Sequence, residues 1–100
     1  MPNITVSVPH QLPQDEALRR TQARIAQFES QFSSKLTDLR ENWTGYVGAF
    51  SGSARGHSVS GTVVVSPSLV TVEIAIPLLW LVFKGRIETG IRDELTTLLA

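Results

Sequence analysis

The sequence predicts an α+β fold with the element order β-α-β-β-β-β-α. Three observations predict it: a short alternating apolar run at the start of the chain, a long helical stripe after it, and four more alternating runs before a second helical stripe. Short connections join the four middle runs, which favours an antiparallel meander. We expect residues 1–100 to form a single domain, because this length is near the common domain size.

The first strand is expected over Ile4–Val8, where β-branched apolar residues alternate with Thr5 and Ser7. Pro9 ends it. A long helix is then expected from about Pro13 to Leu36, because proline is tolerated in a first helical turn. The acidic pair that follows Pro13 has the sign that suits a helix N-terminus. The apolar stripe of this helix repeats every three, four or seven residues, through Leu18, Ile25, Phe28, Phe32 and Leu36.

Four strands should follow, each with a period-two alternation and each bounded by turn residues. Glu73 alternates with the apolar residues of the last strand, so we expect it on the far side of the sheet or in solvent. The alternating runs are Leu39–Trp43, Tyr46–Phe50, Val59–Val65 and Val70–Ile76.

A second helix is expected from Pro77 to the end of the sequence, with its stripe at Trp80, Phe83, Ile87, Ile91, Leu95 and Leu98. Gly85 and Gly90 interrupt it, so the helix bends there or another element packs closely on them. A curved antiparallel sheet with both helices on one face buries both stripes. The preferred strand order places the first strand beside the last, antiparallel, as in a reduced helix-grip fold. The alternative is a parallel pairing of the first and second strands.

Composition excludes several classes of protein. Nine Lys and Arg balance nine Asp and Glu, and 42% of the residues are hydrophobic, so the chain is not disordered. The absence of a cationic excess argues against nucleic acid as a partner. A net charge of zero makes self-association plausible, and we expect a homodimer. The chain has no cysteine and we find no secretory signal, which suits a cytoplasmic protein. The most apolar stretch, Leu69–Phe83, contains Glu73 and Pro77 and is too short for a transmembrane segment.

The sequence contains no catalytic or metal-binding motif, so we expect no enzyme, no cofactor and no metal. His10 is the one candidate polar site and the only plausible general base, but no partner acid or nucleophile is spaced to support catalysis. We expect it to close the corner between the first strand and the long helix by hydrogen bonding. His57 is expected at a turn or on the surface. The cluster Arg19, Arg20 and Arg24 is expected to be a solvated face.

The segment Pro77–Phe83 (PLLWLVF) is more apolar than one buried stripe requires. It either fills the end of the core or forms an exposed patch for a second copy or for a lipid-like or polymer-like surface. The candidate association surface is Leu78, Leu79, Trp80, Leu81 and Val82. A second hypothesis is a small-ligand module, because a curved sheet gripped by a helix can enclose an apolar pocket. Its candidate lining residues are Trp43, Tyr46 and Trp80, and an acyl or hydroxyacyl ligand would suit them.

Short motifs in the same order along nearly the whole chain resemble a known family. They are His10-Gln11-Leu12, then Asp15-Glu16-Ala17, the strand with Trp43, Gly61 in a valine-rich strand, and Lys84-Gly85-Arg86-Ile87-Glu88 leading into Ile91. This arrangement resembles the small polyhydroxyalkanoic acid system proteins. The sequence departs from the family's pattern at two places. The family often has glycine at or next to the position of Pro13, and the turn at Ser51–Gly56 is longer here. The resemblance therefore does not define the turns of the meander.

The resemblance implies a bacterial cytoplasmic protein associated with polyhydroxyalkanoate storage, and it implies no catalytic residue. It also implies that the apolar segment meets a polyester granule or a granule-coating protein. We therefore expect a non-enzymatic accessory protein that acts through an apolar association surface.

Overall fold

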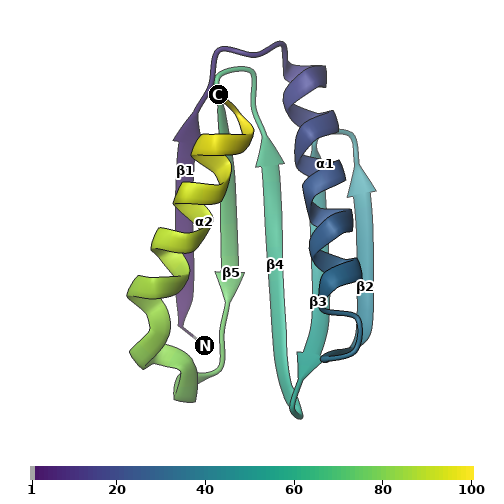
Figure 1. The fold of residues 1–100 in the computed structure, drawn as a ribbon, viewed down its shortest axis with the longest axis vertical. Helices are drawn as coiled ribbons and strands as arrows, with labels where there is room; N and C mark the ends of the chain where they lie inside the picture. Colours follow the sequence, from purple (N-terminus) through teal and green to yellow (C-terminus); the bar gives the residue numbers. More distant parts are fainter. Residues whose placement is uncertain (1) are drawn as a thin grey trace.

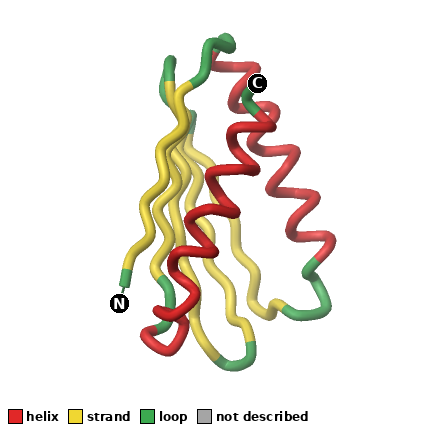
Figure 2. Tube along the Cα trace, turned by 60° about the vertical axis from the view of Figure 1, so that its left-hand side comes forward, coloured by secondary structure: helices red, strands yellow, loops and turns green. Residues whose placement is uncertain are grey.

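The computed structural model describes residues 2–100, which form one antiparallel sheet with both α-helices on the same face (Figure 1, Figure 2). The strand order is β1-β5-β4-β3-β2. The α+β class and the antiparallel pairing of the first strand with the last are confirmed, and the parallel alternative is wrong. The elements are β1 (Asn3–Pro9), α1 (Gln14–Gln31), β2 (Leu36–Thr44), β3 (Val47–Ala54), β4 (His57–Val65), β5 (Leu69–Ala75), the 3-10 helix η1 (Leu78–Phe83) and α2 (Lys84–Leu98).

The period-two alternation of the strands decides which side chains enter the core. In the β1–β5 pair, Ile4 lies opposite Ile74 and Val6 lies opposite Val72, on the face that the helices cover. Glu73 is exposed on the other face, between Thr5 and Thr62 of the neighbouring strands. The expected placement of Glu73 is therefore correct.

The first helix is shorter than predicted. It ends at Gln31, and Leu36 is the first residue of β2, paired with Ala54. Ser33 and Ser34 follow the helix, and serine favours turns over helix interiors because its hydroxyl competes for backbone hydrogen bonds. The helical spacing of Leu36 was thus coincidental, and its side chain belongs to the sheet.

The second helix is also divided. Pro77–Phe83 does not begin an α-helix: Leu78–Phe83 forms η1, and α2 begins only at Lys84. The Trp80 amide donates to the Pro77 carbonyl across 2.9 Å, which is the three-residue hydrogen bond of a 3-10 helix. Trp, Val and Phe within the segment have weak α-helical propensity. In α2, no atom of another element would lie within 4 Å of a Cβ at Gly85 or Gly90, so close packing of another element does not explain either glycine.

The core occupies only part of the inner face of the sheet. Buried apolar side chains come mainly from β1, β4, β5 and the last turns of α2, while α1 contributes Ala17 and the polar Thr21. The solvent-accessible area is 6358 Å², against about 5,600 Å² for a compact monomer of this mass. Figure 2 shows α1 diverging from the sheet toward its C-terminal end. The fold is therefore closed at one end and open at the other.

Candidate association surface

The 3-10 helix η1 carries half of the exposed large apolar side chains among the described residues. The exposed fractions are 71% for Leu78, 73% for Leu79, 45% for Leu81 and 82% for Val82. Trp80, the fifth member of the predicted surface, is half-buried, and its ring lies 6.2 Å from the His57 ring, edge to face. Of the predicted set, four side chains are open to solvent and Trp80 packs inward.

Other exposed apolar side chains lie at the same end of the molecule. Phe28 and Phe32 are near the end of α1, with ring centroids 4.6 Å apart, and Leu39 lies near the start of β2. In both views this end also holds η1 and the β3–β4 turn (Figure 1, Figure 2). We call this set the apolar tip, and it comprises Phe28, Phe32, Leu39, Leu78, Leu79, Leu81, Val82 and Phe83.

Sequence reasoning missed the α1 part of the tip. Phe28 and Phe32 continue the apolar stripe of the helix, so their spacing predicts burial. They are 47% and 37% exposed because that part of α1 has left the sheet. Their spacing carries no signal for this divergence.

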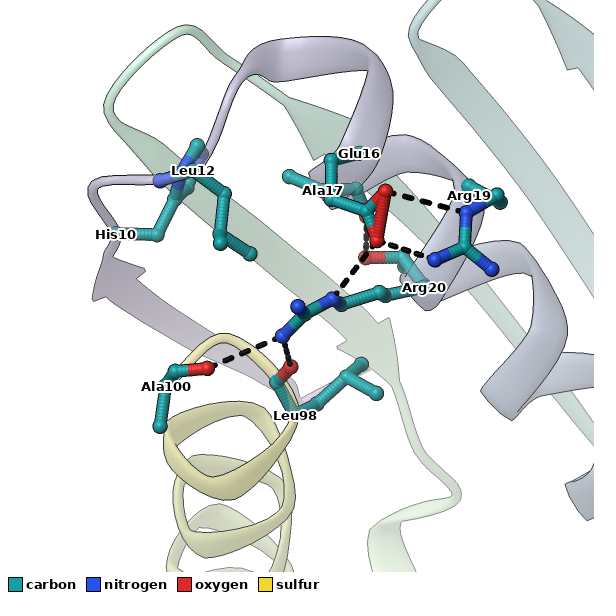
Figure 3. A network of polar contacts seen from close by, with 9 residues as sticks. His10, Leu12, Glu16, Ala17, Arg19, Arg20, Leu98 and Ala100 are labelled. Atoms are coloured by element: carbon teal, nitrogen blue, oxygen red, sulfur yellow. Dashed lines mark hydrogen bonds and ion pairs between the residues drawn. The ribbon is translucent and has the colours of Figure 1, made fainter.

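His10 closes the corner between β1 and α1. Its ring is buried, Nε2 lies 3.0 Å from the Ser66 carbonyl oxygen, and the Leu12 amide donates to Nδ1 across 3.1 Å. These two partners require a neutral ring with its proton on Nε2. Figure 3 shows His10 and Leu12 at this corner, set apart from the Glu16–Arg20 network. Both ring nitrogens are thus engaged by backbone groups at this corner.

The three aromatic residues proposed for a ligand pocket have separate partners. Trp43 lies over Gly48 and meets Phe50 edge to face, Tyr46 donates its hydroxyl proton to Asp15, and Trp80 contacts His57. The surface has two shallow depressions, of about 230 and 270 Å³. Phe50 lines both of them, and none of the three proposed aromatic residues lines either one. The geometry thus gives no support to a pocket built on Trp43, Tyr46 and Trp80.

The arginine cluster on α1 ties the two helices together at the closed end. Arg20 donates to Glu16 and to the Leu98 and Ala100 carbonyls, at 3.0 to 3.1 Å (Figure 3). Arg24 donates from Nε to Glu94 of α2 across 3.1 Å. The expectation of a purely solvated face is wrong for these two residues.

The same arginine cluster lowers the pKa of Glu16. Hydrogen bonds from Arg19 and Arg20 hold the pKa of Glu16 below its ordinary value. Glu16 lies in the first turn of α1, where a negative charge is also favoured by the helix dipole. The contacts at the closed end of the fold therefore favour the ionised form of Glu16.

The fold brings together one pair of acids that lie far apart in sequence. Burial, and secondarily a hydrogen bond with Glu41, raise the pKa of Glu29. Trp43 donates its indole proton to Glu41 across 2.6 Å. Sequence spacing gave no sign of this pair, because one acid is on α1 and the other on β2. Within residues 2–100, no group of three or more His, Cys, Asp or Glu could hold a metal ion.

The fold and these contacts define a small α+β protein. Hydrogen bonds join its two α-helices at one end, and exposed apolar side chains lie at the other end. Residues 4–99 match the family model described as "Putative polyhydroxyalkanoic acid system protein (PHA_gran_rgn)", and the chain belongs to that family. This confirms the resemblance inferred from the motifs.

Other comparisons add little. No curated protein is a significant match. The crystal structure of TTHA0849 from Thermus thermophilus aligns over 98% of this chain and 92% of that chain, with 13% identity and a TM-score of 0.41. No helix within residues 2–100 is both long enough and apolar enough to span a membrane.

Proposed function

We propose that this chain is a non-enzymatic accessory protein of polyhydroxyalkanoate metabolism that acts by apolar association. The observation that carries the proposal is η1, in which Leu78, Leu79, Leu81 and Val82 are 45–82% exposed. Burying a large aliphatic side chain contributes about 1.5–3 kcal/mol, so contact through this helix would favour binding by several kcal/mol. Membership of a polyhydroxyalkanoic acid system family supports a place in that metabolism.

The partner that we propose is the cytoplasmic polyester granule or a protein on its surface. A polyester of hydroxyacids offers an extended, mostly apolar surface, which suits an exposed apolar helix better than a narrow pocket does. A second copy of the chain is the other candidate, because the net charge of zero gives little repulsion between copies.

The test is a double substitution on one side of η1. Leu78 and Leu81 are three residues apart, so they lie on the same side of a 3-10 helix. We expect Leu78→Ser/Leu81→Ser to reduce partitioning onto polyhydroxyalkanoate particles at least tenfold, with an unchanged circular dichroism spectrum. Sedimentation of the same variant reports any change in oligomeric mass.

The matched control is Val47→Thr/Val64→Thr on the outer face of the sheet, where both valines are exposed and lie opposite each other. This control should bind the particles like the wild type. Unchanged partitioning and unchanged mass in a folded Leu78→Ser/Leu81→Ser variant would contradict the proposal.

A further inference from the structure

Basic side chains lie at the same end of the fold as the apolar tip. Lys35 lies in the loop between α1 and β2, Arg55 in the β3–β4 turn, and Arg86 near the start of α2, and all three are exposed. Lys84 is nearby on α2 and forms a long ion pair with Glu88, at 3.9 Å. These four cations come from the α1–β2 loop, the β3–β4 turn and the first turn of α2, which lie at one end of the fold.

Cations outnumber acids narrowly at this end, once Arg40 of β2 is included. The acids are Glu29, Asp38, Glu41 and Glu88. Glu88 forms the ion pair with Lys84, and burial and the neighbouring Glu41 raise the pKa of Glu29, which makes its negative charge less favourable. This end of the fold therefore carries a small excess of positive charge, although the whole chain is neutral.

From this combination we infer that the tip docks on a lipid surface that carries anionic headgroups. The inference rests on the proposed function in one respect, since it takes the apolar tip to be an association surface. It goes further by naming the chemistry of the partner. Apolar side chains that enter the boundary of the acyl chains, with Lys and Arg at the headgroup level, are the arrangement by which interfacial proteins bind membranes.

The shape of the tip favours a fluid partner over a protein. Its side chains come from three separate elements: the end of α1, the start of β2, and η1. Protein interfaces concentrate their binding energy in packed central residues, and neither of the two depressions described above is lined by a residue of the tip. Lipid adapts to an irregular set of protruding side chains, so no preformed pocket is required.

Charge disfavours a second copy at the same place. Two tips that meet end to end would bring Lys35, Arg55 and Arg86 of one copy close to the same residues of the other. Like charges across an interface cost binding energy. An anionic headgroup layer instead attracts each of these cations, which strengthens binding roughly fivefold for each one near the surface.

The experiment measures binding of the full chain to vesicles of phosphatidylcholine alone and of phosphatidylcholine with one part in three phosphatidylglycerol. We expect binding to the anionic vesicles only, weakening as salt is added. Trp80 is in η1, so lipids brominated in their acyl chains should quench its fluorescence on binding. A Trp43→Phe background makes Trp80 the only tryptophan in the chain.

Two pairs of variants separate the charge from the apolar contact. Lys35→Gln/Arg86→Gln should weaken binding to anionic vesicles roughly 25-fold, and Arg19→Gln/Arg92→Gln, which changes two exposed arginines outside the tip, should leave it unchanged. Leu79→Ser/Val82→Ser should abolish the quenching of Trp80.

Each contrary result has a distinct meaning. Binding to polyester particles without binding to anionic vesicles would overturn the lipid inference and leave the proposed function standing. Equal losses in the two charge-removing pairs, or equal binding to neutral vesicles, would also overturn it. A doubled mass that Leu79→Ser/Val82→Ser abolishes would assign the tip to a second copy instead. Failure to bind vesicles or particles would remove both proposals.

Discussion

Gly48 shows how one absent side chain positions a large neighbour. A Cβ at this residue would lie 2.7 Å from Cε2 of Trp43, on the strand that pairs with it. The indole therefore lies directly on the backbone of β3, where it meets Phe50 edge to face at 5.7 Å. Only the register of β2 and β3 shows which ring this glycine accommodates.

We expect Gly48→Ala to destabilise the protein by about 1–3 kcal/mol, because the rigid indole must move to admit a methyl group. Urea denaturation measures the change. Gly90→Ala is the control, since no atom of another element lies within 4 Å of the added Cβ, and it should stabilise α2 by up to about 1 kcal/mol. Equal effects of the two substitutions would contradict this account of Gly48.

Glu29 gives a pH dependence whose sign follows from its raised pKa. Burial and Glu41 favour the protonated form in the folded state, so the folded protein holds this proton more tightly than the unfolded chain. The contribution of Glu29 to stability is then greatest below its ordinary pKa of 4.5 and declines as the pH rises through its folded value.

Glu29→Gln removes the charge and keeps the shape, so we expect it to raise the Tm at pH 7 by about 1–4 °C and to have no such effect near pH 4. Thermal unfolding at the two pH values measures this. A Tm that falls at pH 7 would show that the charged form of Glu29 is favourable in the folded protein.

At the scale of whole elements, the strands followed the sequence more closely than the helices did. Strand faces depend on a period of two that each strand carries locally. The apolar stripe of α1 favours a longer helix, whereas Ser33 and Ser34 favour a turn, and the helix ends before them. The segment Leu78–Phe83 forms a 3-10 helix after Pro77 and not the first turns of an α-helix. The spacing of apolar residues alone predicts neither outcome.

Arg20 joins two elements through one guanidinium group. It donates to the Leu98 carbonyl, which belongs to the last turn of α2, and to the Ala100 carbonyl just beyond the helix. We expect Arg20→Gln to cost about 1–2 kcal/mol of stability and to speed hydrogen exchange in the last turns of α2. Arg19→Gln is the matched control. Within residues 2–100, the polar partner of Arg19 is Glu16 on its own helix, and its loss should change stability by less than about 0.5 kcal/mol.

At the scale of the molecule, the strand order and the placement of both helices on one face were predictable, because two apolar stripes and a meander leave few ways to build a core. The association surface was predictable in part. The excess of apolar residues in η1 stands out in the sequence, whereas Phe28 and Phe32 were indistinguishable from core residues. Their exposure depends on the divergence of α1 from the sheet, which the spacing of apolar residues does not encode.

The start of β1 and the end of α2 lie at opposite ends of the molecule (Figure 1). Asn3 lies toward the end that holds the apolar tip, Ala100 lies beside Arg20, and the longest extent of the molecule is 38 Å (Figure 1). A fluorescent reporter fused ahead of β1 would sit near the proposed contact and hinder it. A reporter fused after Ala100 through a flexible linker would leave that contact free. Labelling experiments in cells should therefore use the C-terminal side.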